Sequence, residues 1–456
     1  MTRVAAHLND AAITLLDGQR ILYREPGFAF LDGERLTTGT EAFAHARMHP
    51  RHIQHRYWRE LVTTPLPDRR FAHLSNADLV SRQLEQMWAA AGPQASELVL
   101  AVPGYMSAEH LALLLGVAAE LSLPVAGMAD AAVAATRREY LNAVPVHVDM
   151  GLHAATLTRL VQNGGQVQLE RVEVIDDCGV YALYDAWTSA VAEVFVQQSR
   201  FDPLYDAESE QKLADALPDW LAQAARGGVV HLALEHRGMR HEAEIEALAL
   251  IGAAAPHYQR LASHLRALYR AEERPAIQVT DRIARLPGLA DMLKARVGGE
   301  VFGLEPGATA RGALARCRES VRQGDAVALK RRLPLDQATV EVAPGEVTAR
   351  AGVPTHVLFG NTAFEIGERP LLLGSRRGDG ERGIVLGGDM PGVSRRHCAF
   401  RRVNGQCVLE DMSRYGTFLN GHRIDGSTVL QVGDTVRVGS PGYEFRLITT
   451  DESHGT

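Results

Sequence analysis

The sequence contains few cysteines, and none of them lie close together. Cys178, Cys317, Cys398 and Cys407 form no Cys-x-x-Cys pair, which argues against a structural zinc site or a disulfide framework. Long hydrophobic runs are also missing, since no apolar stretch approaches the roughly 20 residues that span a bilayer. The first residues, MTRVAAHLNDAAITLL, are a poor signal peptide because polar residues interrupt them. These absences predict a cytoplasmic, soluble protein without a membrane span.

The sequence also lacks an excess of charge of one sign. Its 48 Lys and Arg residues stand against 55 Asp and Glu, a net charge of −7, whereas nucleic-acid-binding domains are usually strongly basic. We therefore expect no nucleic-acid partner. The stretch HARMHPRHIQH brings together four histidines, but Pro50 ends or kinks a helix there and the neighbouring arginines disfavour a cation. We expect no metal site.

Two patterns divide the 456 residues. Up to about residue 306, strand-like runs alternate with Ala- and Leu-rich helical patterns, as in ELVLAVPG followed by SAEHLALLLGVAAELSL, where Ser107 is placed to cap the helix. Strands separated by crossover helices predict an α/β sheet with parallel strands. From about residue 355, short alternating strands between Gly, Asp and Asn turns predict an antiparallel sandwich.

These patterns predict four segments. We expect an α/β domain over 1–315, a linker with room for a short extra strand over 316–354, an all-β domain over 355–450, and a polar tail over 451–456. The linker assignment depends on the basic residues, glycines and prolines between the two patterns.

Polar residues gather in two stretches of the all-β region, GVSRRHCAF and DMSRYGTFLNG. A phosphate dianion is bound by hydroxyl, guanidinium and backbone N–H donors that converge at loop tips on a rigid sheet. The candidate donors are the Ser394 hydroxyl, the guanidinium groups of Arg395, Arg396 and Arg414, and the N–H groups of the turn at Tyr415-Gly416.

With PLLLGSRRGDGERGIVL before them and LQVGDTVRVG after them, these stretches closely resemble a forkhead-associated (FHA) domain in order and spacing. The resemblance implies a reader of phosphothreonine, and hence a phosphothreonine-containing partner protein and a Ser/Thr kinase in the same cell. It implies peptide contacts by Arg376, Ser394, Arg395, Arg414 and Tyr415. It implies structural roles, as loop brace or turn formers, for Gly374, His397, Gly416, Thr417, Asn420 and Gly421.

The sequence departs from the FHA pattern at two positions. The family usually follows its first glycine with the arginine that holds the phosphate, but Gly374 is followed by Ser375, with Arg376 next. Successive strand residues face opposite sides, so Arg376 reaches the phosphate only if the loop is remodelled. Tyr415 stands where many members carry Asn. Two interpretations stay open: a sandwich that binds phosphothreonine, and one that kept its turns and lost its ligand.

The N-terminal region is similar to the actin and heat-shock-chaperone (DnaK-like) ATPase superfamily. The segments that carry the similarity are LVLAVPGYMSAEHLALLLGVAAELSLPVAGMADAAVAA, PVHVDMGLHAATLTRL at the second phosphate loop, and IQVTDRIARLPGLADMLKARVG near the adenosine pocket. The resemblance implies a two-lobed α/β ATPase fold over 1–315, with ATP and Mg²⁺ as ligands.

The phosphate loops of that superfamily are glycine-rich, because backbone N–H groups approach a phosphate only where side chains are missing. Here the first loop has no glycine before Gly18. The second keeps Asp149 and Gly151 but places Leu152 and His153 where further small residues belong. The resemblance therefore predicts a degenerate site, a pseudo-ATPase.

Weak nucleotide binding stays open at Asp149, Gly151 and Asp281, the last in the Thr280-Asp281 turn that replaces Gly-Gly. If activity survives, Asp10 and Asp149 are the residues to position a metal or water, although both also suit strand-end turns.

Three functions follow from this reading. The first is a phosphothreonine-dependent scaffold protein that joins an FHA reader to a pseudo-ATPase and needs no cofactor. The second is an active, chaperone-like or filament-forming ATPase that uses ATP/Mg and is regulated through its FHA domain. The third is an adaptor whose sandwich binds an unphosphorylated partner. We favour the first.

Overall fold

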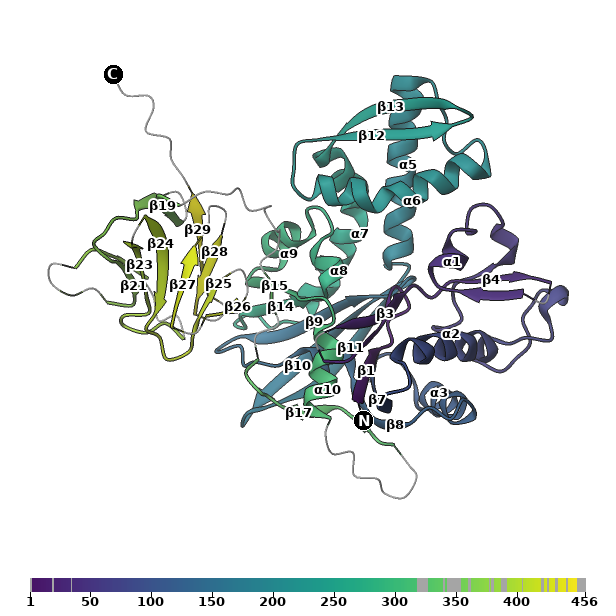
Figure 1. The fold of residues 1–456 in the computed structure, drawn as a ribbon, viewed down its shortest axis with the longest axis horizontal. Coiled ribbons are helices and arrows are strands. Elements are labelled where there is room, and N and C mark those ends of the chain that lie inside the picture. Colours follow the sequence, from purple (N-terminus) through teal and green to yellow (C-terminus); the bar gives the residue numbers. More distant parts are fainter. Residues whose placement is uncertain are drawn as a thin grey trace.

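The computed structural model describes residues 2–448 apart from positions 19, 34, 318–326, 339–340, 343–353, 360–361, 377, 379–380, 387–391, 404, 420–421, 425, 431–433 and 440–441. A mixed α/β region comes first, and a β-rich region follows it (Figure 1). Among the described residues, no helix combines the length and the apolar character that crossing a membrane requires.

The first sheet surrounds the N-terminal strand. Its strands are β1 (Thr2–His7), β2 (Ile13–Leu16), β3 (Ile21–Glu25), β7 (Ala95–Val102), β8 (Val125–Asp130) and β16 (Leu329–Lys330), in the order β3-β2-β1-β7-β8-β16. β1 to β3 form an antiparallel meander, and β7 pairs parallel to β1. The apolar run of β7 is buried from Leu98 to Val102, as a strand covered on both faces requires.

The second sheet repeats this arrangement. Its strands are β9 (Val144–Met150), β10 (Ala154–Asn163), β11 (Gln166–Asp176), β14 (Pro275–Val279), β15 (Glu300–Leu304), β17 (Arg332–Pro334) and β18 (Glu341–Val342). β9 to β11 form the meander, and β14 pairs parallel to β9 and β15 to β14. Leaving out its edge strands, the order β11-β10-β9-β14-β15 matches β3-β2-β1-β7-β8 of the first sheet. The predicted parallel pairs are therefore present, each beside an antiparallel meander.

Helices cover the sheets and begin at the residues that can cap them. They are α2 (Asn76–Ala91), α3 (Ala108–Glu120), α4 (Ala131–Ala135), α8 (Asp281–Ala284), α9 (Leu289–Val297) and α10 (Ala308–Arg316). Ser75 and Asp78 form a reciprocal capping box at α2. Ser107 caps α3 by accepting the His110 N–H at 3.2 Å, which confirms its predicted role.

Two additions extend from the sheets. One contains β4 (Ala29–Asp32), β5 (Arg35–Thr38), β6 (Ile53–Gln54), α1 (Thr40–Phe43) and the short helical turns η1 (Pro50–His52) and η2 (Arg69–Phe71). The other contains α5 (Val180–Ser199), α6 (Ala207–Ala224), α7 (Ala247–Ala267) and the hairpin β12 (Val229–His236) with β13 (Met239–Glu246). The first addition lies at the right of Figure 1 and the second at the top.

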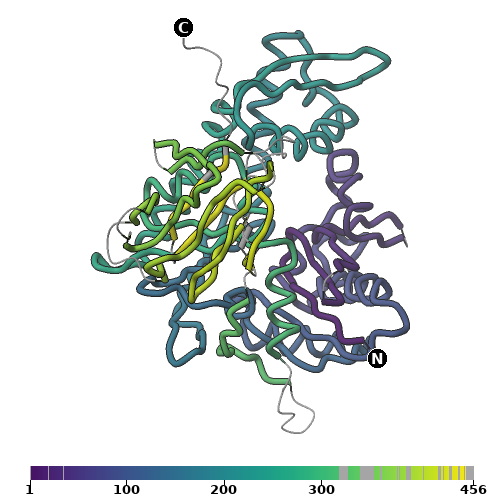
Figure 2. The backbone as a smooth tube through the Cα atoms, turned by 60° about the vertical axis from the view of Figure 1, so that its left-hand side comes forward, coloured from purple at the N-terminus to yellow at the C-terminus, as the bar shows by residue number. Residues whose placement is uncertain are grey.

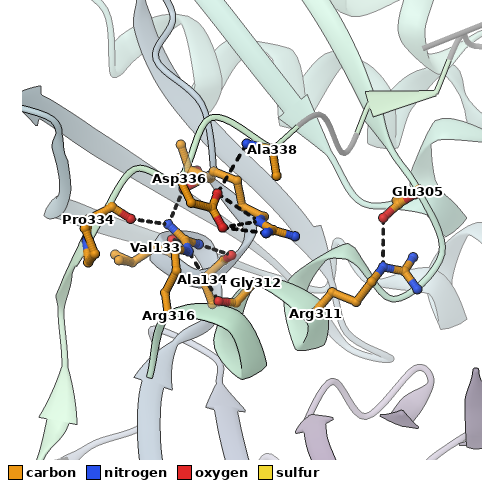
Figure 3. A network of polar contacts seen from close by, with 11 residues as sticks. Val133, Ala134, Glu305, Arg311, Gly312, Arg316, Pro334, Asp336 and Ala338 are labelled. Atoms are coloured by element: carbon orange, nitrogen blue, oxygen red, sulfur yellow. Dashed lines mark hydrogen bonds and ion pairs between the residues drawn. The ribbon is translucent and has the colours of Figure 1, made fainter. Parts of the chain in front are cut away.

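The prediction of a linker over 316–354 is wrong for much of its described part. β16 pairs with β8, β17 with β11, and β18 with β15, so this segment adds an edge strand to both sheets. Arg316, buried at the end of α10, donates to the Pro334 and Thr136 carbonyl oxygens, and Asp336 pairs with Arg137 (Figure 3). Charged hydrogen bonds of this kind, invisible to composition, hold the segment on the α/β region.

The β-rich region is a sandwich of two sheets. One has the order β20-β19-β29-β28-β25-β26 and the other β22-β21-β23-β24-β27. Their bounds are β19 (His356–Phe359), β20 (Thr362–Glu365), β21 (Leu371–Gly374), β22 (Gly383–Val385), β23 (Cys398–Val403), β24 (Gln406–Asp411), β25 (Thr417–Leu419), β26 (His422–Arg423), β27 (Ser427–Leu430), β28 (Thr435–Val438) and β29 (Tyr443–Ile448). The pairing is antiparallel as predicted, except that β22 runs parallel to β21.

The sandwich lies beside the second sheet of the α/β region rather than the first, as two views agree (Figure 1, Figure 2). Its core is formed by alternating residues of both sheets, including Leu373, Phe400, Leu409, Val436 and Phe445, all buried. A closed core of this size holds the loops at the ends of the strands on a rigid support.

Candidate functional site

Three loops of the sandwich meet at Ser394. The Arg414 backbone N–H donates to the Ser394 hydroxyl oxygen at 3.1 Å. From the loop after β21, the Ser375 N–H donates to the Ser394 carbonyl at 3.1 Å and the Arg376 N–H to the Arg395 carbonyl at 3.3 Å. The Ser394 hydroxyl proton is not used in the bond with Arg414, so it is available to donate outward.

His397 braces two of these loops from beneath. It is fully buried, its Nδ1 accepts the Ser394 N–H at 3.1 Å, and its Nε2 lies 3.2 Å from the Gly416 carbonyl. Because a backbone N–H only donates, the ring proton must sit on Nε2 and donate to Gly416. Burial lowers the pKa of His397, which keeps the ring neutral and suited to this double contact.

Two glycines are required by the close packing of the loops. At Gly374 an added Cβ would come 2.0 Å from the Arg395 carbonyl oxygen. Gly416 has φ +96°, a conformation that other residues rarely adopt. Its N–H donates to the Ser413 hydroxyl at 2.7 Å, so the expectation that Gly416 offers a free N–H donor is wrong.

Arginines surround Ser394 at the surface. Arg376, Arg395 and Arg414 are exposed, and within the described chain no ion pair or hydrogen bond engages their guanidinium groups. Arg414 lies over the Tyr415 ring at 5.7 Å, and Tyr415 is 53% exposed. The residue directly after Gly374 is a serine and not the arginine usual in the family, but Arg376 one position later still supplies a guanidinium group to the loop after β21. The arrangement provides a hydroxyl and three guanidinium groups that no described carboxylate neutralises, the groups that bind a phosphate dianion.

The second set of candidate residues lies between the two sheets of the α/β region. The Asp149 carboxylate accepts from the Asn9 side-chain amide at 2.6 Å and from the Thr280 hydroxyl at 2.9 Å. The Asp10 carboxylate accepts the Leu152 N–H at 2.8 Å. Protein donors from the neighbouring strands therefore occupy both carboxylates.

The space beside these carboxylates is also filled. Arg24 of β3 forms an ion pair with Asp281 at 2.7 Å, and Arg282 donates to the Met150 carbonyl at 3.3 Å. Two cavities lined by described residues lie there, each of about 20 Å³. Such a cavity holds about one water molecule, whereas small-molecule sites usually measure about 300 Å³ or more.

The electrostatics of the two carboxylates differ. Burial raises the pKa of Asp10 to about 6. Burial also opposes ionisation of Asp149, but His7, whose Nε2 lies 3.3 Å from the carboxylate, and the positive charge of Arg282 hold the pKa of Asp149 below its usual range. At Gly151 an added Cβ would come 2.4 Å from the Asp10 carboxylate, so this glycine is already required by the packing of Asp10.

The histidine-rich stretch packs with aromatic rings. His45 stacks on Phe30 with 4.4 Å between ring centroids, and His55 Nδ1 lies 2.8 Å from His153 Nε2. In the part of the chain that the structure describes, no three His, Cys, Asp or Glu side chains gather as a metal site.

Residues 372–439 match the family model described as FHA domain. The C-terminal resemblance is thereby confirmed, and an FHA domain implies phosphothreonine-dependent interaction with a partner protein. A search of curated proteins gave no match. The resemblance of 1–315 to the actin and heat-shock-chaperone superfamily has no family match and stays a prediction.

The structure brings together most of the predicted peptide-binding residues around Ser394. Asn420, Gly421 and Arg377 lie outside the described residues, as does the predicted tail. Sequence reasoning missed Asp411, whose carboxylate accepts from the Thr417 hydroxyl at 2.7 Å and the Ser413 N–H at 3.0 Å. The Asp-x-Ser pattern, which is typical of an Asx turn, could have indicated this role of Asp411. It also missed Asn9 and Arg282, which only the tertiary fold brings to Asp149.

Proposed function

We propose that the chain is a phosphothreonine-dependent scaffold protein, in which an FHA reader is joined to a pseudo-ATPase of actin-like fold. The observation that carries the reader is the meeting of three loops at Ser394. The Arg414 N–H donates to the Ser394 hydroxyl oxygen. Arg376 and Arg395, whose backbones are hydrogen-bonded to each other beside Ser394, are exposed. These groups suit a dianion held at the surface of a rigid sheet. A Ser/Thr kinase in the same cytoplasm is part of this proposal.

The test of the reader is a titration of the full chain with a phosphothreonine peptide library and its unphosphorylated counterpart. Ser394→Ala removes a hydrogen bond to a charged group, worth about 1.5–3 kcal/mol, so affinity should fall by roughly 10- to 100-fold. Ser427→Ala, an exposed serine on β27, is the matched control and should bind normally. Equal affinity for the unphosphorylated library would contradict the reader and favour an adaptor for unphosphorylated partners.

The pseudo-ATPase rests on two further observations. The matching strand order of the two sheets supports the two-lobed fold that the resemblance implies. The ion pair of Arg24 with Asp281 and the small cavities beside Asp149 argue that a nucleotide finds no room there. Calorimetric titration with ATP and Mg²⁺ should show no saturable heat. Saturable binding, with hydrolysis that is lost in Asp149→Asn, would instead favour the active ATPase.

A further inference from the structure

The sandwich rests on the α/β region through stacked arginines and aromatic rings. Arg437 of β28, buried, lies 5.1 Å from the ring centroid of Phe302 on β15 and 4.9 Å from that of Phe418 on β25. Arg138, also buried, lies 4.5 Å from the Tyr140 ring and 5.7 Å from the Phe418 ring. Desolvated cation–π contacts of this kind fix two surfaces against each other. The loop that carries Arg138 is thereby held beside the sandwich.

This contact leaves a pocket of about 320 Å³ next to the loop at Ser394. Arg414, Tyr415 and Arg423 line it from the sandwich, and Arg138, Glu139 and Gln337 line it from the α/β region. The Gln337 side-chain oxygen accepts the Glu139 N–H at 3.4 Å, which joins the two segments of the far wall. Arg414 and Tyr415 belong to both the pocket and the loop at Ser394, so the pocket adjoins the surface where the reader would hold a peptide.

The charge of the pocket indicates what enters it. Neither Arg414 nor Arg423 has an ion pair within the described chain, and both are exposed. Among the described residues that line the pocket, one carboxylate, that of Glu139, stands against these two guanidinium groups. A volume of about 320 Å³ lies at the lower end for ligand pockets, which suits one or two side chains of a peptide. The excess of guanidinium groups favours an anionic side chain.

We propose that this composite pocket takes an anionic side chain next to the phosphothreonine, so that the α/β region takes part in selecting the peptide sequence. The anion is a carboxylate or a second phosphate. The inference rests on the proposed reader function, and it assigns Glu139 a role in specificity: its charge limits how strongly the pocket attracts an anion.

The experiment compares three phosphothreonine peptides, with alanine, glutamate or phosphoserine flanks, binding to the full chain. We expect about tenfold tighter binding of an anionic flank than of alanine, from one charge-assisted hydrogen bond. In Arg423→Gln this ratio should fall toward one. In Glu139→Gln it should rise about two- to fivefold, as for an exposed charge pair. Glu120→Gln, an exposed residue on α3 away from the sandwich (Figure 1), is the control and should leave the ratio unchanged.

A second readout places the effect in the α/β region. Amide hydrogen exchange of residues 137–141 should slow with the anionic peptides and not with the alanine peptide. Equal affinities for the three peptides, or a ratio that Glu139→Gln does not move, would overturn the inference and leave the reader standing. Absence of binding to any of the three would overturn the reader and the inference with it. Preference for phosphoserine over glutamate would identify the anion as a second phosphate.

Discussion

Replacing His397 with alanine should loosen the recognition loops of the FHA domain. The substitution removes the acceptor of the Ser394 N–H and the donor to the Gly416 carbonyl. An unsatisfied buried group costs about 1–3 kcal/mol. Gly416 is buried, but Ser394 is half-buried, so water reaches its N–H and the cost there is at the low end. Together we expect about 2–4 kcal/mol less stability of the FHA domain.

The assay must report on this domain alone. All four tryptophans, Trp58, Trp88, Trp187 and Trp220, lie in the α/β region, so their fluorescence in urea follows that region and should change little. Amide exchange of residues 372–439 follows the FHA domain and should accelerate by roughly 30- to 1,000-fold, since about 1.4 kcal/mol corresponds to a factor of ten. Val429→Ala, a control at a side chain 49% exposed, should accelerate exchange little. Unchanged exchange in His397→Ala would refute the bracing role.

Three further predictions concern packing and pH. Burial lowers the pKa of His397. Its neutral ring therefore contributes stability that is complete above about pH 6.5 and is lost as the pH falls through the lowered pKa. Amide exchange of residues 372–439 that does not change with pH beyond its intrinsic dependence would contradict this. Gly374→Ala places a Cβ 2.0 Å from the Arg395 carbonyl oxygen, so it should lower the stability of the FHA domain by more than about 2 kcal/mol and weaken phosphopeptide binding. The control Gly367→Ala, whose Cβ would have its nearest neighbour at 3.6 Å, should be tolerated. Normal melting and binding of Gly374→Ala would argue against the close packing. Arg316→Ala should destabilise the α/β region by about 3–5 kcal/mol. Tryptophan fluorescence should then show a lower urea midpoint. An unchanged midpoint would show that this side chain does not hold the segment after α10.

The FHA domain could be predicted from the sequence because its signals are local. The spacing of Ser394 and His397, and the glycine at 416, follow from the geometry of single turns, which neighbouring residues dictate. The brace itself needs only that His397 lies three residues after Ser394 and that the next loop passes above it. The residues around Asp149 could not be predicted in the same way, since Asn9 and Thr280 reach it from distant parts of the chain.

The segment after α10 shows the limit of composition. Its charged residues and prolines are typical of a linker, yet Arg316 and Asp336 are bonded to the α/β region. From sequence alone a charged side chain is predicted to be exposed to solvent, because its neighbours in the chain do not indicate whether carbonyl oxygens from another element will surround it. For that reason its composition predicts a linker, whereas its described strands pair with both sheets.

Periodicity and turn chemistry, which act over a few residues, determined the α/β character of the first region and the antiparallel sandwich of the second. Only the tertiary structure decided that Arg24 and Asp281 close the space beside Asp149, and that Arg138 and Glu139 lie next to the reader loop. These contacts join residues far apart in the chain, and their energies depend on burial and on the sign of nearby charges, which exist only after the chain has folded.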